Sequence, residues 1–123
     1  MSDYLWVAVG SGLGGVARLA CSDLAVRVTG HRFPWGTLLI NIVGSLVIGY
    51  VAGFAGRAHP LGDPTVAVFL MVGVCGGYTT FSAVSLQTLT LAQEGAWRRA
   101  AFYVVASVLL CVVATALGFS AAA

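Results

Sequence analysis

Polar and aromatic side chains recur every three or four residues inside stretches of the sequence that are otherwise apolar. The three series are Thr37, Asn41 and Ser45; Phe81, Ser85 and Thr88; and Tyr103, Ser107, Cys111 and Thr115. Residues at this spacing share one face of an α-helix, so each series would form a stripe. The pattern predicts helices that present uncharged hydroxyl, amide and aromatic groups. Hydrogen bonding between helices is the alternative use of such stripes.

Uncharged donors of this kind suit the passage of a small, strongly hydrated anion. Such an ion exchanges its water for O–H and N–H groups, and conduction needs several weak sites rather than one tight site. The edge of an aromatic ring carries positive character, so the ring of Phe81 also suits an anion. Arg18, one turn before Ser22, either enriches anions at a pore mouth or extends to the membrane interface.

The centre of the third apolar stretch is poor helix-forming material. Two glycines, Gly76 and Gly77, are separated by one tyrosine from the β-branched Thr79 and Thr80, and none of these four residues favours a helix. We expect the helix to break here into two halves, and lipid tolerates a break only where the freed backbone faces protein, water or an ion. Freed carbonyl oxygens suit a cation. A continuous helix weakened by glycine for close packing is the alternative.

The composition places these stripes in a membrane. Only 8 % of the 123 residues are charged and 59 % are hydrophobic, with a mean hydropathy of +0.97. Four stretches are long enough to cross a bilayer as helices, at residues 4–26, 35–55, 65–92 and 100–119. We therefore predict a single all-α domain of four transmembrane helices. The net charge of +2 and the lack of a basic stripe argue against a nucleic-acid partner.

Several other features lead to simpler expectations. Only Asp3 precedes the first apolar run, so we expect a permanent span rather than a cleaved signal peptide. The glycine pairs at positions 10 and 14 and at 49 and 53 are expected to let helices pack closely. The three cysteines at positions 21, 75 and 111 are expected to be small buried hydrophobic residues. No nucleophile–base pair, paired carboxylates or metal-ligand cluster predicts an enzyme.

The motifs resemble those of a known family, the small bacterial fluoride channels called Fluc or CrcB. Residues 14–18 (GGVAR) resemble its first-helix motif, and residues 36–45 (GTLLINIVGS) resemble its GTLxxNxxGS motif. Residues 73–82 (GVCGGYTTFS) are similar to its central GxxGGxTTFS motif, and Tyr103 with Ser107 matches its fourth helix. Four motifs in order, one in each expected span, make the resemblance specific.

The resemblance implies an antiparallel dimer in the bacterial inner membrane, with two fluoride pores and passive release of fluoride that enters the cell as HF. It further implies a structural, non-transported Na⁺ at the dimer centre, held by the carbonyls of Gly76 and Thr79. The implied fluoride pathway is lined by Asn41, Phe81, Ser107, Thr37 and Tyr103, and Arg18 lies at the pore vestibule. Fluoride and membrane lipid are then the partners of the chain.

Two features depart from the simplest version of this family. The usual TTFSTF run has a second phenylalanine where this chain has Val84, and an aliphatic group lacks the positive ring edge. The expected cytoplasmic links carry four arginines (27, 32, 98 and 99) and the opposite side only Arg57. Such a bias predicts one fixed orientation. It favours a heterodimer with a related, oppositely inserted subunit over a homodimer of dual topology, and both remain open.

Two other functions compete with conduction. A non-conducting structural subunit of a heterodimeric channel is favoured by Val84. A small four-helix exporter of cationic drugs or guanidinium would need a glutamate embedded in its first helix. The only glutamate here is Glu94, in a link between spans.

Overall fold

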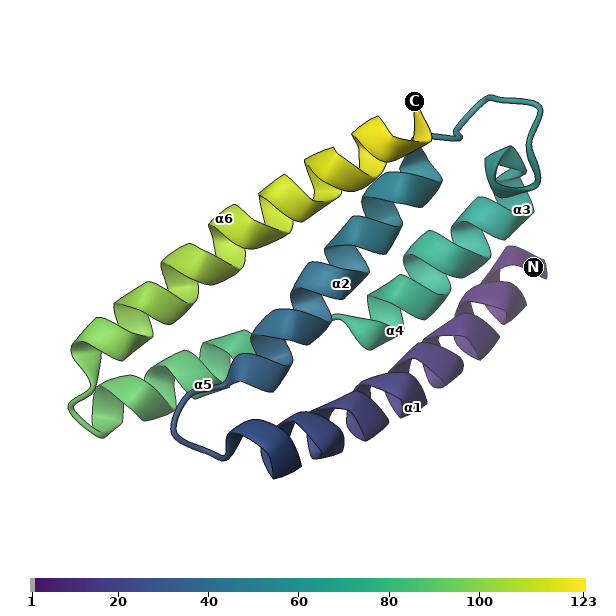
Figure 1. Ribbon diagram of the computed structural model, residues 1–123. Coiled ribbons are helices and arrows are strands. Elements are labelled where there is room, and N and C mark those ends of the chain that lie inside the picture. The colour runs from purple at the N-terminus through teal and green to yellow at the C-terminus, as the bar shows by residue number, and fades with distance from the viewer. Residues whose placement is uncertain (1) are drawn as a thin grey trace.

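The computed structural model describes residues 2–123, and those residues contain no β-strand. Four helical segments are long and apolar enough to cross a membrane: Ser2–Thr29, Trp35–Ala52, Pro64–Gln93 and Trp97–Ala122. The first, second and fourth of these are helices α1, α2 and α6 (Figure 1). The prediction of an all-helical chain with four membrane-capable helices is confirmed.

The third segment is built from several pieces. In chain order they are α3 (Pro64–Ala67), the π-helix η2 (Val68–Cys75), α4 (Gly76–Tyr78) and α5 (Phe81–Gln93). A short 3₁₀ turn, η1 (Pro60–Gly62), precedes them. The carboxylate of Asp63 accepts hydrogen bonds from the N–H groups of Thr65 and Val66, at 2.9 and 3.2 Å, and so caps the start of α3.

The ends of the helices differ from the spans expected from hydropathy. Helices α1 and α6 continue past residues 4–26 and 100–119, because arginines near a helix end do not interrupt its backbone hydrogen bonds. Helix α2 ends at Ala52 rather than at residue 55. The chain turns there and passes through Gly56, whose φ of +74° is readily available only to glycine.

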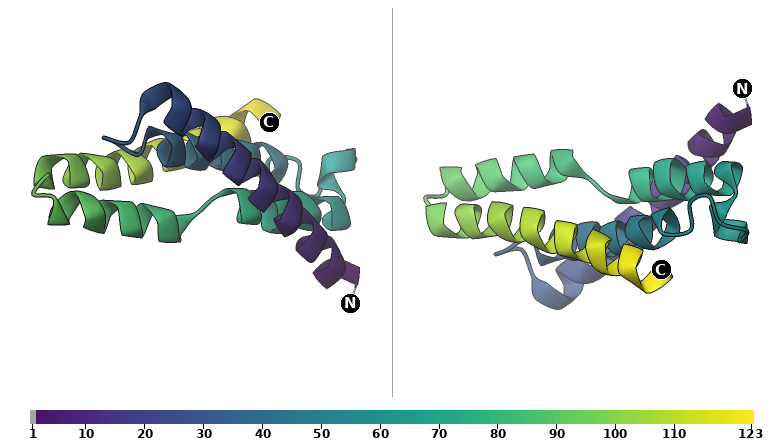
Figure 2. Two further views of the ribbon diagram at one scale, coloured as in Figure 1. Left: turned by 90° about the horizontal axis from the view of Figure 1, so that it is seen from below. Right: turned by 90° about the horizontal axis from the view of Figure 1, so that it is seen from above.

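The four segments lie side by side in two closely packed pairs. Helix α6 runs along α2, and α1 runs along η2 and α4 (Figure 1). The two halves of the third segment are offset from each other, and α5 packs against the first part of α6 (Figure 2).

Glycine allows the close approach within each pair. A Cβ on Gly10 of α1 would lie 2.9 Å from the carbonyl oxygen of Phe69 in η2, and one on Gly14 would overlap the carbonyl of Val74. In the other pair, a Cβ on Gly49 of α2 would overlap the carbonyl of Thr115 in α6. The prediction that these glycines serve helix packing is confirmed.

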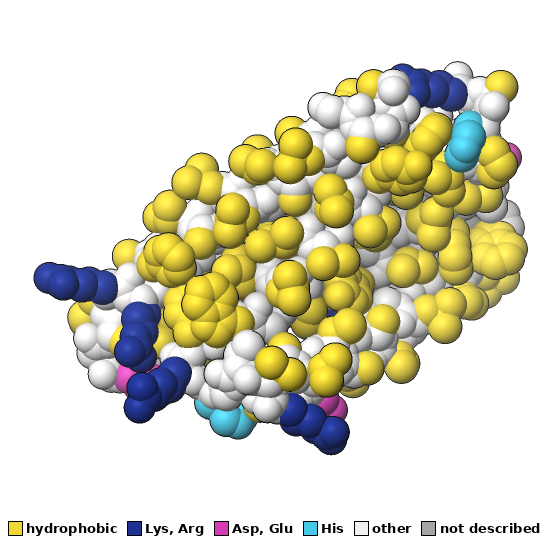
Figure 3. Space-filling view, in the orientation of Figure 1, with side chains coloured by type: hydrophobic (Ala, Val, Ile, Leu, Met, Phe, Trp, Pro, Cys, Tyr) yellow, Lys and Arg dark blue, Asp and Glu magenta, His cyan; other side chains and the backbone are white. Residues whose placement is uncertain are grey.

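The surface matches a membrane environment. Large apolar side chains such as Leu5, Leu13, Leu109 and Leu117 are more than half exposed on the outer faces of α1 and α6. Yellow hydrophobic side chains cover most of the view in Figure 3, while arginine side chains gather mainly toward the ends of the molecule. Lipid is the medium in which such a surface is stable.

The three cysteines occupy different environments. Cys75 is buried, Cys111 is half-buried and Cys21 is exposed. The expectation of three buried cysteines is therefore wrong for Cys21, which is exposed beside a hollow between α1 and α2, and only partly right for Cys111.

Candidate functional site

Two residues with extended backbone separate α4 from α5. Helix α4 ends at Tyr78; Thr79 has φ −81° and ψ 158°, Thr80 has φ −151° and ψ 115°, and α5 begins at Phe81. The hydroxyl of Thr80 accepts a hydrogen bond from the N–H of Ala83 at 3.2 Å and caps the new helix. The β-branched threonines favour this extended backbone over helix.

The side chain of Asn41 holds this link from the neighbouring helix α2. Its Nδ2 donates to the carbonyl of Thr80 at 3.2 Å, and its Oδ1 accepts from the N–H of Thr80 at 2.9 Å. Both backbone groups of Thr80 are thus satisfied by one amide that is itself buried. Asn41 therefore positions the start of α5.

The same bonds free two carbonyl oxygens. In a continuous helix the N–H of Thr80 would reach the carbonyl of Gly76, and the N–H of Ala83 would reach that of Thr79. Here those two N–H groups donate to Asn41 and to the Thr80 hydroxyl instead. Among residues 2–123, no group of three His, Cys, Asp or Glu side chains could hold a metal. The oxygen ligands that the link offers a cation are backbone carbonyls and threonine hydroxyls.

A groove of about 460 Å³ lies between α2, α5 and α6, next to the link. We call it the central groove. It brings together members of all three predicted stripes, and none of its lining side chains is charged; the lining includes Asn41, Ser45, Phe81, Val84, Ser85, Thr88, Ser107 and Cys111. Of the predicted site residues, Asn41, Phe81, Ser107 and the variant position Val84 meet here.

Ser107 differs from the other hydroxyl groups around the groove. Its side chain is 7 % exposed, and its Oγ has no hydrogen-bond partner in the structure. By contrast, the hydroxyls of Ser85 and Thr88 donate to carbonyls of their own helix at 3.1 and 2.7 Å. A buried polar group without a partner costs about 1–3 kcal/mol. The Ser107 hydroxyl is thus an unpaired hydrogen-bonding group beside the groove, with its oxygen just beneath the accessible surface.

The two hydrophobic positions on this side of α5 have opposite surroundings. Phe81 is 84 % exposed, so its ring stands at the open rim of the groove. Val84, almost one turn later, packs against the buried cluster of Leu38, Leu91 and Tyr103 while also lining the groove. This chain therefore places the aromatic ring of Phe81 at the rim of the central groove and the aliphatic side chain of Val84 deeper in it.

Tyr103 and Thr37 are buried outside the central groove. Tyr103 is 0 % exposed, and its hydroxyl donates to Oε1 of Gln87 in α5 at 2.7 Å. Because that oxygen is occupied, the amide nitrogen of Gln87 is the part left to face other groups. The sequence reasoning missed Gln87, although it lies three residues after Val84 and so on the same side of α5.

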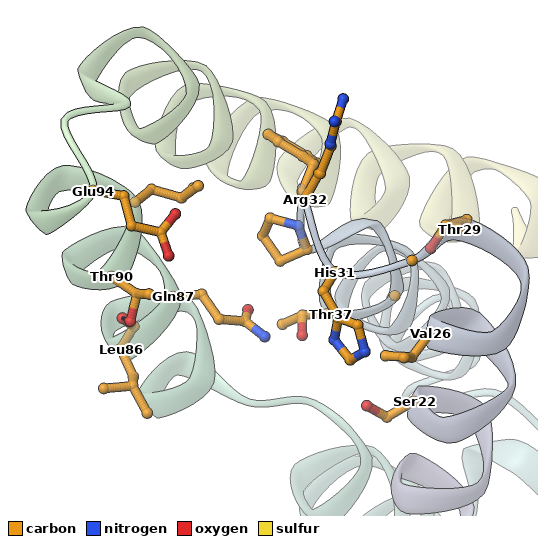
Figure 4. A pocket seen from close by; sticks show the side chains of 15 residues that line it. Ser22, Val26, Thr29, His31, Arg32, Thr37, Leu86, Gln87, Thr90 and Glu94 are labelled. Carbon is orange, nitrogen blue, oxygen red and sulfur yellow. Dashed lines mark hydrogen bonds between the residues drawn. The ribbon is translucent and has the colours of Figure 1, made fainter.

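Two adjoining hollows of about 220 and 430 Å³ open near this amide. Both are lined by Ser22, Thr37 and Gln87, and we call them together the vestibule. In Figure 4 the side chain of Gln87 extends from α5 toward Thr37 and His31, with Ser22 of α1 opposite. Arg18 lines the larger hollow together with Thr80 and Ser82 of the link region.

These features define a class: a multi-pass membrane protein whose third segment is interrupted beside an uncharged groove, with a polar vestibule carrying an arginine. Residues 5–119 match the family described as CrcB-like protein, Camphor Resistance (CrcB). The chain belongs to this family, and it is a bacterial membrane protein.

Curated relatives are similar over almost their whole length. A protein of Rhodospirillum rubrum is 54 % identical, with 94 % of this chain and 90 % of the relative aligned. A protein of Opitutus terrae is 50 % identical over 99 % of this chain and 93 % of its own length, and one of Methylocella silvestris is 44 % identical over 94 % and 89 %. Each of the three is named fluoride-specific ion channel FluC.

Proposed function

We propose that this chain is a subunit of a fluoride-selective channel that lets cytoplasmic fluoride leave the cell passively and so lowers its toxicity. The observation that carries the proposal is the free hydroxyl of Ser107 in a groove without charged side chains. The names of the relatives in three bacteria support the choice of ion. A channel of this kind performs no covalent chemistry.

The central groove suits fluoride because its available contacts are weak and none of its lining side chains is charged. The Ser107 hydroxyl replaces part of the hydration shell, and the edge of the exposed Phe81 ring adds a second favourable contact. A fixed positive charge at this depth would hold the ion too tightly for release. Asn41 contributes mainly by fixing the start of α5, and therefore the position of Phe81.

The vestibule would deliver the anion to the groove. Arg18 raises the local anion concentration without lying in the groove itself. Tyr103 acts through its hydrogen bond to Gln87, which leaves the Gln87 amide nitrogen for the ion. Thr37, which lines both hollows of the vestibule, adds a hydroxyl on the opposite side.

We further propose that the interruption of the third segment lies at mid-membrane and meets its counterpart in an antiparallel partner. A structural Na⁺ would then be held by the carbonyls of Gly76 and Thr79 from each subunit. The loss of helical hydrogen-bond donors to these two carbonyls supports this arrangement. Carbonyl oxygens are suitable ligands for a hard monovalent cation.

The partner in this proposal is a second copy or a related subunit. Phe81 stands exposed at the rim of the groove, where it could also serve the partner's pore. The bias of four arginines against one favours a fixed orientation for this chain, and hence a related subunit inserted the other way. Equal insertion of this chain in both orientations, measured by epitope accessibility, would contradict the heterodimer.

A second candidate is a structural subunit that does not conduct. Val84 favours it, because the aliphatic side chain gives the deeper wall of the groove no ring edge. In this case the chain would complete a partner's pore with Phe81 while its own groove stays closed to fluoride.

Fluoride release from liposomes tests the proposal. The purified chain is reconstituted with potassium fluoride inside and sodium present, and release is followed with a fluoride electrode after valinomycin is added. Fast fluoride release without chloride release from matched vesicles supports a conducting homodimer. A silent chain is reconstituted again with a related subunit. Silence of the folded pair would contradict the proposed function.

A further inference from the structure

Cys111 lies at the junction of two hollows along α6. It lines the central groove and also a second hollow of about 580 Å³ that continues along α6 past Thr115 to Ser120. Ser45 of α2 is the other residue that lines both. A group that extends from one hollow into the other therefore passes the half-buried Cys111.

The other two thiols lie away from this passage. Cys75 is buried in η2. Cys21 is exposed on the side of α1 that faces Tyr78, and its sulfur accepts a hydrogen bond from the hydroxyl of Tyr78 at 3.6 Å. Its surroundings are a mainly apolar hollow between α1 and α2, lined by Leu24 and Leu39 among others. Of the three thiols, only that of Cys111 is partly exposed and belongs to the central groove, which Ser45 and Ser107 also line.

A second observation indicates that the groove holds a polar ligand at this level. Ser107 is one turn before Cys111 on α6. Its side chain is buried, with 7 % exposed, and its Oγ has no hydrogen-bond partner. An unsatisfied hydroxyl beside a groove of about 460 Å³ can be satisfied by a water molecule or an anion in that groove. Water beside Cys111 matters because the reactive thiolate forms only where it is solvated.

We propose that Cys111 is a covalent modification site within the anion path, at which small sulfenylating reagents close the groove to fluoride. The inference rests on the proposed function and adds a means of control to the same groove. In the reaction with a thiosulfonate, the thiol proton passes to water and the sulfur attacks the sulfenyl sulfur. A protein–reagent disulfide forms as the thiosulfonate S–S bond breaks, and sulfinate leaves with the bonding electron pair.

The steric and the chemical effects of modifying Cys111 both reduce the passage of fluoride. The added group would occupy the junction between the two hollows, one turn from the Ser107 hydroxyl. It also replaces an S–H donor by an alkyl disulfide, which donates no hydrogen bond to an anion. We expect fluoride release to fall at least about tenfold, because the affected contact is in series with the rest of the path.

The test uses methyl methanethiosulfonate on proteoliposomes of the form that conducts, either this chain alone or this chain with its related partner. Modification is located by peptide mass, and release is compared before and after treatment. We expect modification at Cys111, loss of release, and recovery after reduction. Cys111→Ser should be insensitive relative to its own untreated rate. Cys21→Ser is the matched control and should remain sensitive.

Three results would overturn the inference. In the first, Cys111 stays unmodified while Cys21 reacts. In the second, Cys111 is modified and release is unchanged. In the third, Cys111→Ser is inhibited as strongly as the native sequence. Each leaves the proposed function intact, because the untreated protein still releases fluoride. A protein that is silent before treatment, alone and with its partner, instead contradicts the proposed function and removes the basis of this inference.

Discussion

Two positions on the polar stripe of α6, one at its end and one within it, show how differently the same spacing can be used. Thr115 lies where α6 meets α2 at Gly49, and its hydroxyl is within hydrogen-bond distance of the carbonyls of Ser45 and Cys111, at 3.2 and 3.0 Å. Ser107, two turns earlier, lies where α2 and α6 leave room for the central groove, and its hydroxyl has no partner. The hydroxyl of Thr115 is used in helix packing, whereas that of Ser107 remains available for a ligand.

Backbone approach explains the difference. At the tight end, the glycines at positions 49 and 118 bring the two helices so close that the carbonyls of one meet the Cα atoms of the other. Near Ser107 the facing positions include Asn41 and Ser45, whose side chains are directed to the link or line the groove. A hydroxyl near a close helix contact finds a carbonyl, whereas one beside a groove does not.

The largest expected effect is loss of folding when the tight end is forced open. Gly49→Leu places a side chain against the carbonyl of Thr115, so we expect the free energy of unfolding to fall by about 3 kcal/mol. Fluoride release would be lost with the folded state. Size-exclusion profiles after graded heating in detergent measure the effect. Gly12→Leu is the control, because nothing lies within 4 Å of a Cβ at Gly12; equal stability of both variants would contradict the packing argument.

The next effect concerns the link that borders the groove. Asn41→Ala leaves the N–H and C=O of Thr80 without their partners, which we expect to lower the free energy of unfolding by about 2 kcal/mol. Release should fall as well, since the start of α5 loses its fixed position. Thermal denaturation and fluoride release are measured together. Thr65→Ala serves for comparison, because Thr65 is exposed at the start of α3 and lines neither the central groove nor the vestibule.

A pair of substitutions on α6 tests the difference between Ser107 and Thr115 most directly. Ser107→Ala removes an unpaired buried hydroxyl, so stability should hold or rise slightly while fluoride release falls about tenfold through loss of one hydrogen bond worth about 1.4 kcal/mol. Thr115→Val removes a paired hydroxyl, so stability should fall by about 1 kcal/mol with release changed much less. If the two variants lost stability and fluoride release in parallel, Ser107 and Thr115 would serve the same purpose.

The sequence was sufficient for the number of helices, because hydropathy averages over many residues. Spacing also predicted that Asn41, Phe81 and Ser107 each lie on a stripe, and the family resemblance implied that the three line one pathway. The sequence could not separate Ser107 from Thr115, because both are hydroxyl residues on one helix face. The distinction depends on how closely α2 approaches α6 at each level, and that approach depends on glycines of both helices, Gly49 and Gly118.

Two further details lay beyond the sequence patterns. The π-helix η2 at Val68–Cys75 has the same apolar composition as an α-helix, and spacing alone gives no signal for the wider turn. The hydrogen bond from Tyr103 to Gln87 joins two different helices, so neither stripe predicts it. Tyr103 was expected to line the ion pathway. In the structure it is fully buried, and Gln87 stands between it and the vestibule.

The smallest expected effect decides between the two roles left open for Arg18. Its place in the lining of the vestibule leads us to expect that Arg18→Gln slows fluoride release about two- to threefold at low ionic strength, by lowering the local anion concentration. The difference should shrink in a concentrated non-permeant salt, where the screening length falls to about 3 Å at 1 M. Arg99→Gln, near the start of α6 and outside both hollows, should have no such effect. If the two variants behaved alike at every salt concentration, the arginine would be an interfacial anchor, and the groove alone would have to attract the ion.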